Sequence, residues 1–132
     1  MRVLYWPVDR AVDVSGGAAE LVALSLALAA GAGTVPATSS AEPDFGGTEL
    51  VAVEVAATDG PGVRMTVDQD RRVLLVEGDR RALTDLAEEF RSTADLDDGG
   101  HQHIEHHPDH PYLAADSLAL ILNSPHGGMP GR

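Results

Sequence analysis

The sequence predicts an α+β fold, a two-layer sandwich in which a mostly antiparallel sheet carries two helices on one face. Three observations predict it. Apolar residues alternate with a period of two in several short segments, which is typical of strands with one buried face. In two other segments they recur with helical spacing. A strand, a glycine turn and a helix also follow one another in each half of the chain.

The N-terminal part predicts a strand at residues 3–6 and a helix at residues 17–30. The helix has one apolar stripe of Leu21, Leu24 and Leu28 and a second of Val22, Leu26 and Ala29. A helix that is apolar on two sides must be buried twice. Either its own chain covers both stripes, or the second stripe packs against another copy in a homodimer.

The middle of the chain predicts a loop followed by three strands. Residues 35–48 are rich in Pro, Ser and Gly, which indicates a connection that could contain one edge strand. A strand follows at 50–57. Residues 63–68 alternate strictly between apolar and polar side chains, and 73–76 resume the pattern after a polar turn. This pair predicts an antiparallel hairpin.

A second helix is predicted to begin after Asp79 and to end near Thr93. Asp79 is the expected N-cap, because its carboxylate can accept hydrogen bonds from amides of the first turn. The apolar stripe has i, i+3, i+4, i+7 spacing and consists of Leu83, Leu86, Ala87 and Phe90. Two more strands are expected at 102–106 and 118–122.

Both helical segments contain the same four residues. Val14, Gly16, Leu21 and Leu24 recur 62 positions later as Val76, Gly78, Leu83 and Leu86. An internal βα duplication would explain this pattern. Two unrelated segments that solve the same strand-to-helix problem would explain it equally well, and the predicted architecture requires neither.

A chain of 132 residues is the size of one domain. We expect a single α+β domain over residues 1–123 and a flexible C-terminal tail at 124–132, where Pro and Gly leave few apolar groups. The absence of cysteine excludes a disulfide framework and a thiolate zinc site, which suits a cytoplasmic protein. No apolar stretch reaches the roughly 20 residues that span a membrane, and no signal peptide is expected.

Acidic residues dominate the charge. The 21 Asp and Glu outnumber 9 Arg, there is no Lys, and the net charge is -12. Such a chain opposes binding to nucleic acid, which depends on neutralising phosphates. It favours a cationic protein partner, although acidity also serves solubility alone.

Five of the six histidines lie between residues 101 and 110. On a strand, His101 and His103 would face the same side about 6.6 Å apart, close enough to share a divalent metal. His107 and His110 could complete the site if Pro108 and Pro111 fold the chain back. The alternative is a solvent-exposed strand with Ile104 in the core and histidines that bind nothing.

No sequence motif indicates an enzyme. The chain has no Cys nucleophile, no Gly-x-Ser-x-Gly elbow, no phosphate loop and no dinucleotide fingerprint. No cofactor is expected, apart from the divalent metal that the histidines could bind.

The C-terminal half carries a family resemblance. Val76-Glu77-Gly78, Leu83, Leu86, the run from Gly100 to Glu105, Pro111-Tyr112-Leu113 and Ser117-Leu118 resemble the Immunity protein 32 family of bacterial polymorphic toxin systems. The similarity spans roughly residues 72–124. It implies a small α+β fold and a role in neutralising a toxin made by the same cell. It assigns no chemistry to His101, His103 or Glu105.

These observations favour a non-enzymatic cytoplasmic binding protein, which would use an acidic face to occlude a basic toxin. A metal-binding module built on the His-x-His strand is the alternative.

Overall fold

The computed structural model describes residues 1–38, 47–95, 101–105 and 112–123, with the side chain of His101 left out. In chain order the elements are β1 (Arg2–Trp6), β2 (Ala11–Ser15), α1 (Ala18–Ala30), β3 (Ala32–Pro36), β4 (Thr48–Glu49), β5 (Ala52–Ala57), β6 (Val63–Asp68), β7 (Val73–Gly78), α2 (Arg80–Ala94), β8 (His101–Ile104) and β9 (Ala119–Asn123). The predicted tail at 124–132 lies outside the described residues.

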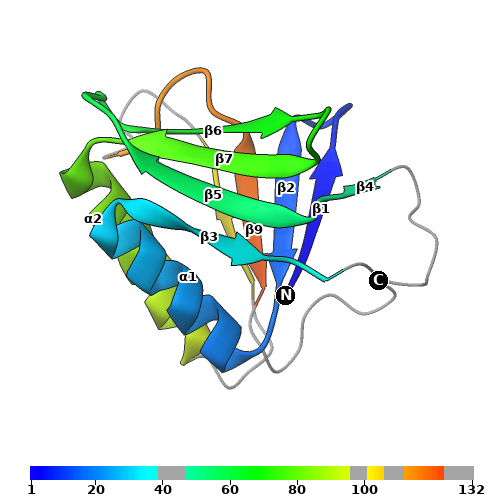
Figure 1. The fold of residues 1–132 in the computed structure, drawn as a ribbon, viewed down its shortest axis with the longest axis horizontal. Helices are drawn as coiled ribbons and strands as arrows, with labels where there is room; N and C mark the ends of the chain where they lie inside the picture. The colour runs from blue at the N-terminus through cyan, green and yellow to red at the C-terminus, as the bar shows by residue number, and fades with distance from the viewer. Residues whose placement is uncertain (39–46, 96–100, 106–111, 124–132) are drawn as a thin grey trace.

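The strands form two sheets instead of the one shared sheet that the sequence predicts. Sheet A has the order β4-β1-β2-β9-β8, and sheet B has the order β3-β5-β7-β6. Figure 1 shows their strands running in clearly different directions. Each sheet is antiparallel except for one central parallel pair, β2 with β9 and β5 with β7. In both pairs the partners come from opposite halves of the chain.

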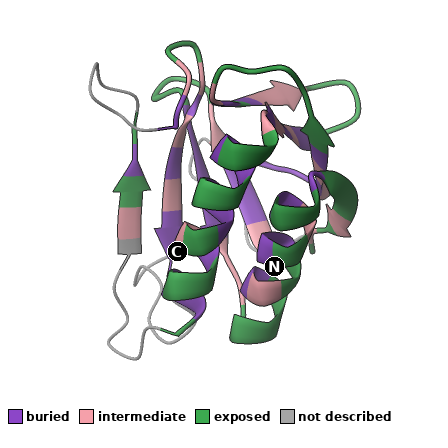
Figure 2. Cartoon of the chain, turned by 90° about the vertical axis from the view of Figure 1, so that its left-hand side faces the viewer, coloured by how far each residue is buried: buried purple, intermediate pink, exposed green. Residues whose placement is uncertain are grey.

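Both helices lie side by side on one side of the molecule (Figure 2), so the α+β sandwich is confirmed. Arg80, at the start of α2, donates a hydrogen bond to the carbonyl oxygen of Ala29, near the end of α1, at 3.3 Å. The two helices are therefore antiparallel. The guanidinium also places a positive charge at the C-terminal end of α1, where the helix dipole favours it.

The first stripe of α1 is buried as expected, but the second is not. Leu21, Leu24 and Leu28 are at most 1% exposed, whereas Leu26 is 59% exposed. Val22 is half-buried and Ala29 is exposed. Of the two alternatives, burial of both stripes by the chain itself is therefore wrong for the described residues, and the homodimer stays a prediction.

The second helix matches its predicted bounds. The side chain of Asp79 accepts a hydrogen bond from the backbone amide of Ala82 at 3.1 Å, so Asp79 is the N-cap. The helix ends at Ala94, one residue beyond the predicted end. Its apolar stripe is buried.

One hydrophobic core joins both sheets and both helices. Sheet A contributes Val3, Val12, Val14, Ile104, Leu120 and Leu122; sheet B contributes Val53, Val55, Val63, Met65, Leu74 and Val76; and the helices contribute Leu21, Leu24, Leu28, Leu83, Leu86 and Phe90. Because these residues belong to one cluster, neither sheet is packed independently of the other.

The two halves of the chain have the same topology. We call β1, β2, α1, β3 and β5 the first unit and β6, β7, α2, β8 and β9 the second unit. In each unit an antiparallel hairpin leads into a helix, and two further antiparallel strands follow. The opening hairpin of each unit pairs with the closing strands of the other.

The correspondence extends to the turns of the two opening hairpins. Arg10 and Arg72, which are 62 positions apart, are the two non-glycine residues with positive φ in the described chain, at 50° and 57°. The carbonyl oxygen of Arg10 accepts a hydrogen bond from Ala119 at 3.0 Å, and that of Arg72 accepts one from Val51 at 2.7 Å. The four shared residues alone did not decide whether the chain contains an internal repeat, and the structure supports one.

Candidate functional site

The histidine strand lies at the edge of sheet A. Its backbone pairs with β9, with His103 opposite Ile121. The side chain of His103 is exposed, and that of Ile104 is 6% exposed. For the other predicted metal ligands, the structure describes only the backbone of His101, and His107 and His110 lie outside the described residues.

A hollow of about 490 Å³ opens on the outer face of sheet A, beside His103. We call it the sheet A hollow. Its lining consists of Trp6, Asp9, Ala11, Asp13, His103, Glu105, Ala119 and Ile121. Three apolar residues from the two central strands share this face with Trp6 at the end of β1. Carboxylates come from the β1–β2 turn, from β2 and from the residue after β8.

A buried polar contact supports this face from within the sheet. Asn123, which is fully buried, donates from its side-chain amide to Asp13 Oδ1 at 2.6 Å, to Ser15 Oγ at 3.0 Å and to the carbonyl oxygen of Val14 at 3.1 Å. Asp13 is 5% exposed. These bonds join β2 to β9 side by side, so they hold the central strands of the hollow in register.

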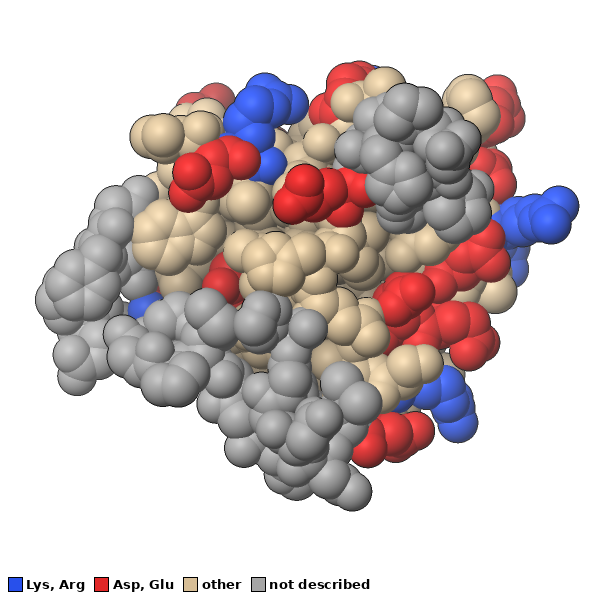
Figure 3. Space-filling view, turned by 180° about the vertical axis from the view of Figure 1, so that it is seen from behind, with Lys and Arg blue, Asp and Glu red and all other residues tan. Residues whose placement is uncertain are grey.

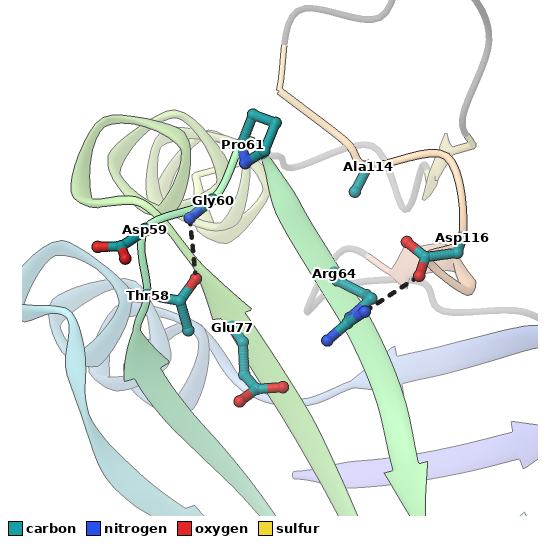
Figure 4. Close-up of a pocket in the computed structure, with 9 residues that line it drawn as sticks. Thr58, Asp59, Gly60, Pro61, Arg64, Glu77, Ala114 and Asp116 are labelled. Carbon is teal, nitrogen blue, oxygen red and sulfur yellow. Dashed lines mark hydrogen bonds and ion pairs between the residues drawn. The ribbon is translucent and has the colours of Figure 1, made fainter.

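A second hollow, of about 310 Å³, lies where the β5–β6 loop meets residues 114–116 (Figure 4). Arg64 pairs with Asp116 at 3.1 Å across its opening. The hydrogen bond from Arg64 lowers the pKa of Asp116. Gly62, at the edge, has φ +78°, and a Cβ there would lie 2.7 Å from the carbonyl oxygen of Tyr112. The loop is therefore closely fitted to the segment before β9.

The second hollow offers charge but no arrangement for nucleophilic catalysis. Its hydroxyl, on Thr58, accepts a hydrogen bond from the amide of Gly60 at 3.2 Å. The described lining residues include no imidazole that could act as its general base. The residues that line the second hollow therefore lack the pairing of a hydroxyl with an imidazole base that nucleophilic catalysis by a serine or threonine uses.

The described residues contain no group of three or more His, Asp or Glu positioned to hold a metal ion. No described helix is both long and apolar enough to cross a membrane. The predicted metal site with His101, His103, His107 and His110 stays a prediction, since three of its four side chains are outside the description.

Acidic side chains are spread over the surface. Seen from behind, the molecule shows more Asp and Glu than Arg, with a concentration along the edge formed by the helices (Figure 3). On α2, Asp85 and Glu88 are exposed. The acidic character expected from the net charge of -12 is therefore visible on this face.

The sequence reasoning missed most of the sheet A hollow. Trp6, Asp9 and Asp13 reach the histidine strand only through the parallel pairing of β2 with β9. Local patterns do not reveal which distant strands pair. The available signal was Asp13 itself, a carboxylate between Val12 and Val14 in a short strand.

The comparison with protein families found a match within the second unit. Residues 73–125 match the family model described as Immunity protein 32. The match confirms the resemblance that the sequence predicts, and it spans β7 through β9 together with α2. Comparisons with curated proteins and with solved structures gave no match.

Proposed function

We propose that this chain is a non-enzymatic cytoplasmic immunity protein that neutralises a toxin by binding and occluding a basic surface on it. The observation that carries the proposal is the Immunity protein 32 match over residues 73–125. The net charge of -12 supports a basic partner.

The charge distribution suits fast capture of such a partner. A strongly acidic surface attracts a cationic protein over a distance, and the attraction weakens as salt screens it. Rapid association would be useful to a protein that must intercept a toxin inside the producing cell. Binding of this kind needs a complementary surface and no catalytic group.

Titration against a toxin encoded beside this chain tests the proposal. We expect a stoichiometric complex by co-purification and calorimetry, with a Kd that rises as salt concentration increases. Failure to bind any neighbouring toxin at low salt would contradict the proposal.

The metal alternative has its own test. If the histidine strand is a metal site, protein purified without an affinity tag will contain stoichiometric metal, and zinc or nickel will raise its Tm. Elemental analysis with no metal, together with an unchanged Tm, would remove this alternative.

A further inference from the structure

The internal repeat gives the sheet A hollow a counterpart on sheet B. Asp13 pairs with Ile121 in the central parallel pair of sheet A, and Leu75 pairs with Glu54 in that of sheet B. Asp13 and Leu75 are 62 positions apart, so the two pairs are equivalent. The same offset relates Trp6 to Asp68 and Asp9 to Arg71.

On sheet B, a guanidinium of the chain itself lies at the equivalent place. Arg71 forms an ion pair with Glu54 on β5 and another with Asp68 at the end of β6, the latter at 3.8 Å. Strand β7 runs between β5 and β6. The arginine side chain therefore links the two strands that flank β7 across the outer face of sheet B.

On sheet A the charges at these positions are changed. Asp9 stands where sheet B has Arg71, while Trp6 and Ile121 stand where sheet B has the carboxylates of Asp68 and Glu54. Glu105 adds another carboxylate to the rim, and both Asp9 and Glu105 are exposed. The described lining of the sheet A hollow contains no Arg, and Lys is absent from the sequence.

We propose that the sheet A hollow binds an arginine side chain of the toxin, which would take the place that Arg71 holds on sheet B. This inference rests on the proposed function. Ala119 and Ile121, which are half-buried, offer an apolar surface to the aliphatic stem of that arginine. Trp6 contributes an aromatic ring, on which a guanidinium can stack, and the exposed Asp9 and Glu105 contribute opposite charge.

Arginine suits this lining better than lysine. Its guanidinium is planar, stacks on aromatic rings and is more weakly hydrated than an ammonium, so it loses less on entering a partly apolar hollow. Arginine is also one of the residue types that most often dominate the binding energy of protein interfaces.

The first test needs no toxin. Trp6 is the only tryptophan of the chain, so its fluorescence reports on the hollow directly. We expect N-acetyl-arginine methylamide to change this fluorescence in a saturable way, and its uncharged isostere N-acetyl-citrulline methylamide to have little effect. The double variant Asp9→Asn with Glu105→Gln should abolish the difference. Equal responses to both compounds in the wild-type chain would overturn the inference.

The second test uses the toxin and a matched pair of variants. Asp9→Asn with Glu105→Gln removes two exposed charges at the hollow, and Asp85→Asn with Glu88→Gln removes two exposed charges on α2. We expect the first variant to lose about tenfold or more in affinity and the second to lose much less, because only the first removes partners of the anchoring guanidinium. Thermal unfolding of both variants would verify that the fold is retained.

The two tests separate this inference from the proposed function. A toxin that binds both double variants equally would overturn the arginine site and leave the immunity function standing. Absence of toxin binding by the wild-type chain would overturn the function, and the fluorescence titration would still decide whether the hollow accepts a guanidinium.

Discussion

Asn123 is a fully buried polar residue whose side chain joins β9 to β2. Its side-chain amide donates hydrogen bonds to Asp13, to Ser15 and to the backbone carbonyl of Val14. Asn123 and Asp13 are 110 positions apart in the sequence. We expect Asn123→Ala to lower the free energy of unfolding by about 1 to 3 kcal/mol, because buried acceptors lose their donor. Urea unfolding measures the change.

Ser15→Ala is the matched control for this prediction. It removes a half-buried hydroxyl that accepts from Asn123 and donates to Asp13 Oδ1 at 3.4 Å, and it leaves the bonds from Asn123 to Asp13 and Val14, so its cost should be smaller. Equal costs for the two variants would show that the amide does not have the role assigned to it.

The lowered pKa of the Asp79 carboxyl group predicts that the stability of the fold depends on pH. Hydrogen bonds from the amides of Ala82 and Gly62 lower its pKa from the ordinary value of 3.8. A carboxyl group whose pKa is lower in the folded state stabilises the fold above its unfolded pKa. That contribution is lost as the pH falls through the folded pKa.

We therefore expect the difference in the free energy of unfolding between wild type and Asp79→Ala to become smaller at acidic pH. Wild type should be more stable than Asp79→Ala near neutral pH, and the gap in urea midpoint should shrink below about pH 4. Comparing the two chains cancels the parallel effects of Glu20 and Asp116, whose pKa values are also lowered. A gap that is independent of pH would contradict the assigned role of Asp79.

Asp79 and Asn123 show which contacts can be predicted from local sequence and which cannot. The cap of Asp79 was predictable, because its partner Ala82 is three positions away and capping chemistry is local. The contact between Asn123 and Asp13 was not, since nothing in either segment says that β9 lies parallel to β2. For the same reason, the sequence did not predict that Trp6 and Asp9 lie beside the histidine strand.

At the scale of elements, the two helices have equivalent places but different exposed faces. On α2 the exposed face is charged, whereas on α1 it carries Leu26 and several alanines, and Glu20 is the one charged residue of α1. The helix bounds followed from apolar spacing and end signals. The splitting of the strands into two sheets did not, because it depends on pairing between opposite halves of the chain.

Leu26 and Leu24 give a direct test of the α1 surface. Leu26→Arg should change the free energy of unfolding by no more than about 0.5 kcal/mol, because the side chain is 59% exposed. Leu24→Ala should cost about 2 to 5 kcal/mol, because Leu24 is 1% exposed in the core. Similar costs for both would contradict the orientation of α1.

The variant Leu26→Arg also tests the predicted homodimer. If the second stripe of α1 pairs with another copy, sedimentation will find wild type as a dimer at high concentration and Leu26→Arg as a monomer. A monomeric wild type under those conditions would remove the homodimer.

At the level of the whole molecule, the residues that match the family model complete their sheets only with strands from the first unit. Residues 73–125 contain β7 through β9, and the first unit supplies the strands that pair with them. Neither unit forms its sheets alone, because β2 lies against β9 and β5 lies against β7. Each sheet is therefore built by both halves of the chain.

The decisive measurement for the proposed neutralisation is the activity of a toxin encoded beside this chain, assayed with increasing amounts of the chain. Occlusion by a non-enzymatic binder predicts that toxin activity falls in proportion to the chain added and reaches zero near equal molar amounts. Undiminished toxin activity at a large excess of the chain would contradict neutralisation, and complete inactivation by a small fraction of an equivalent would contradict occlusion.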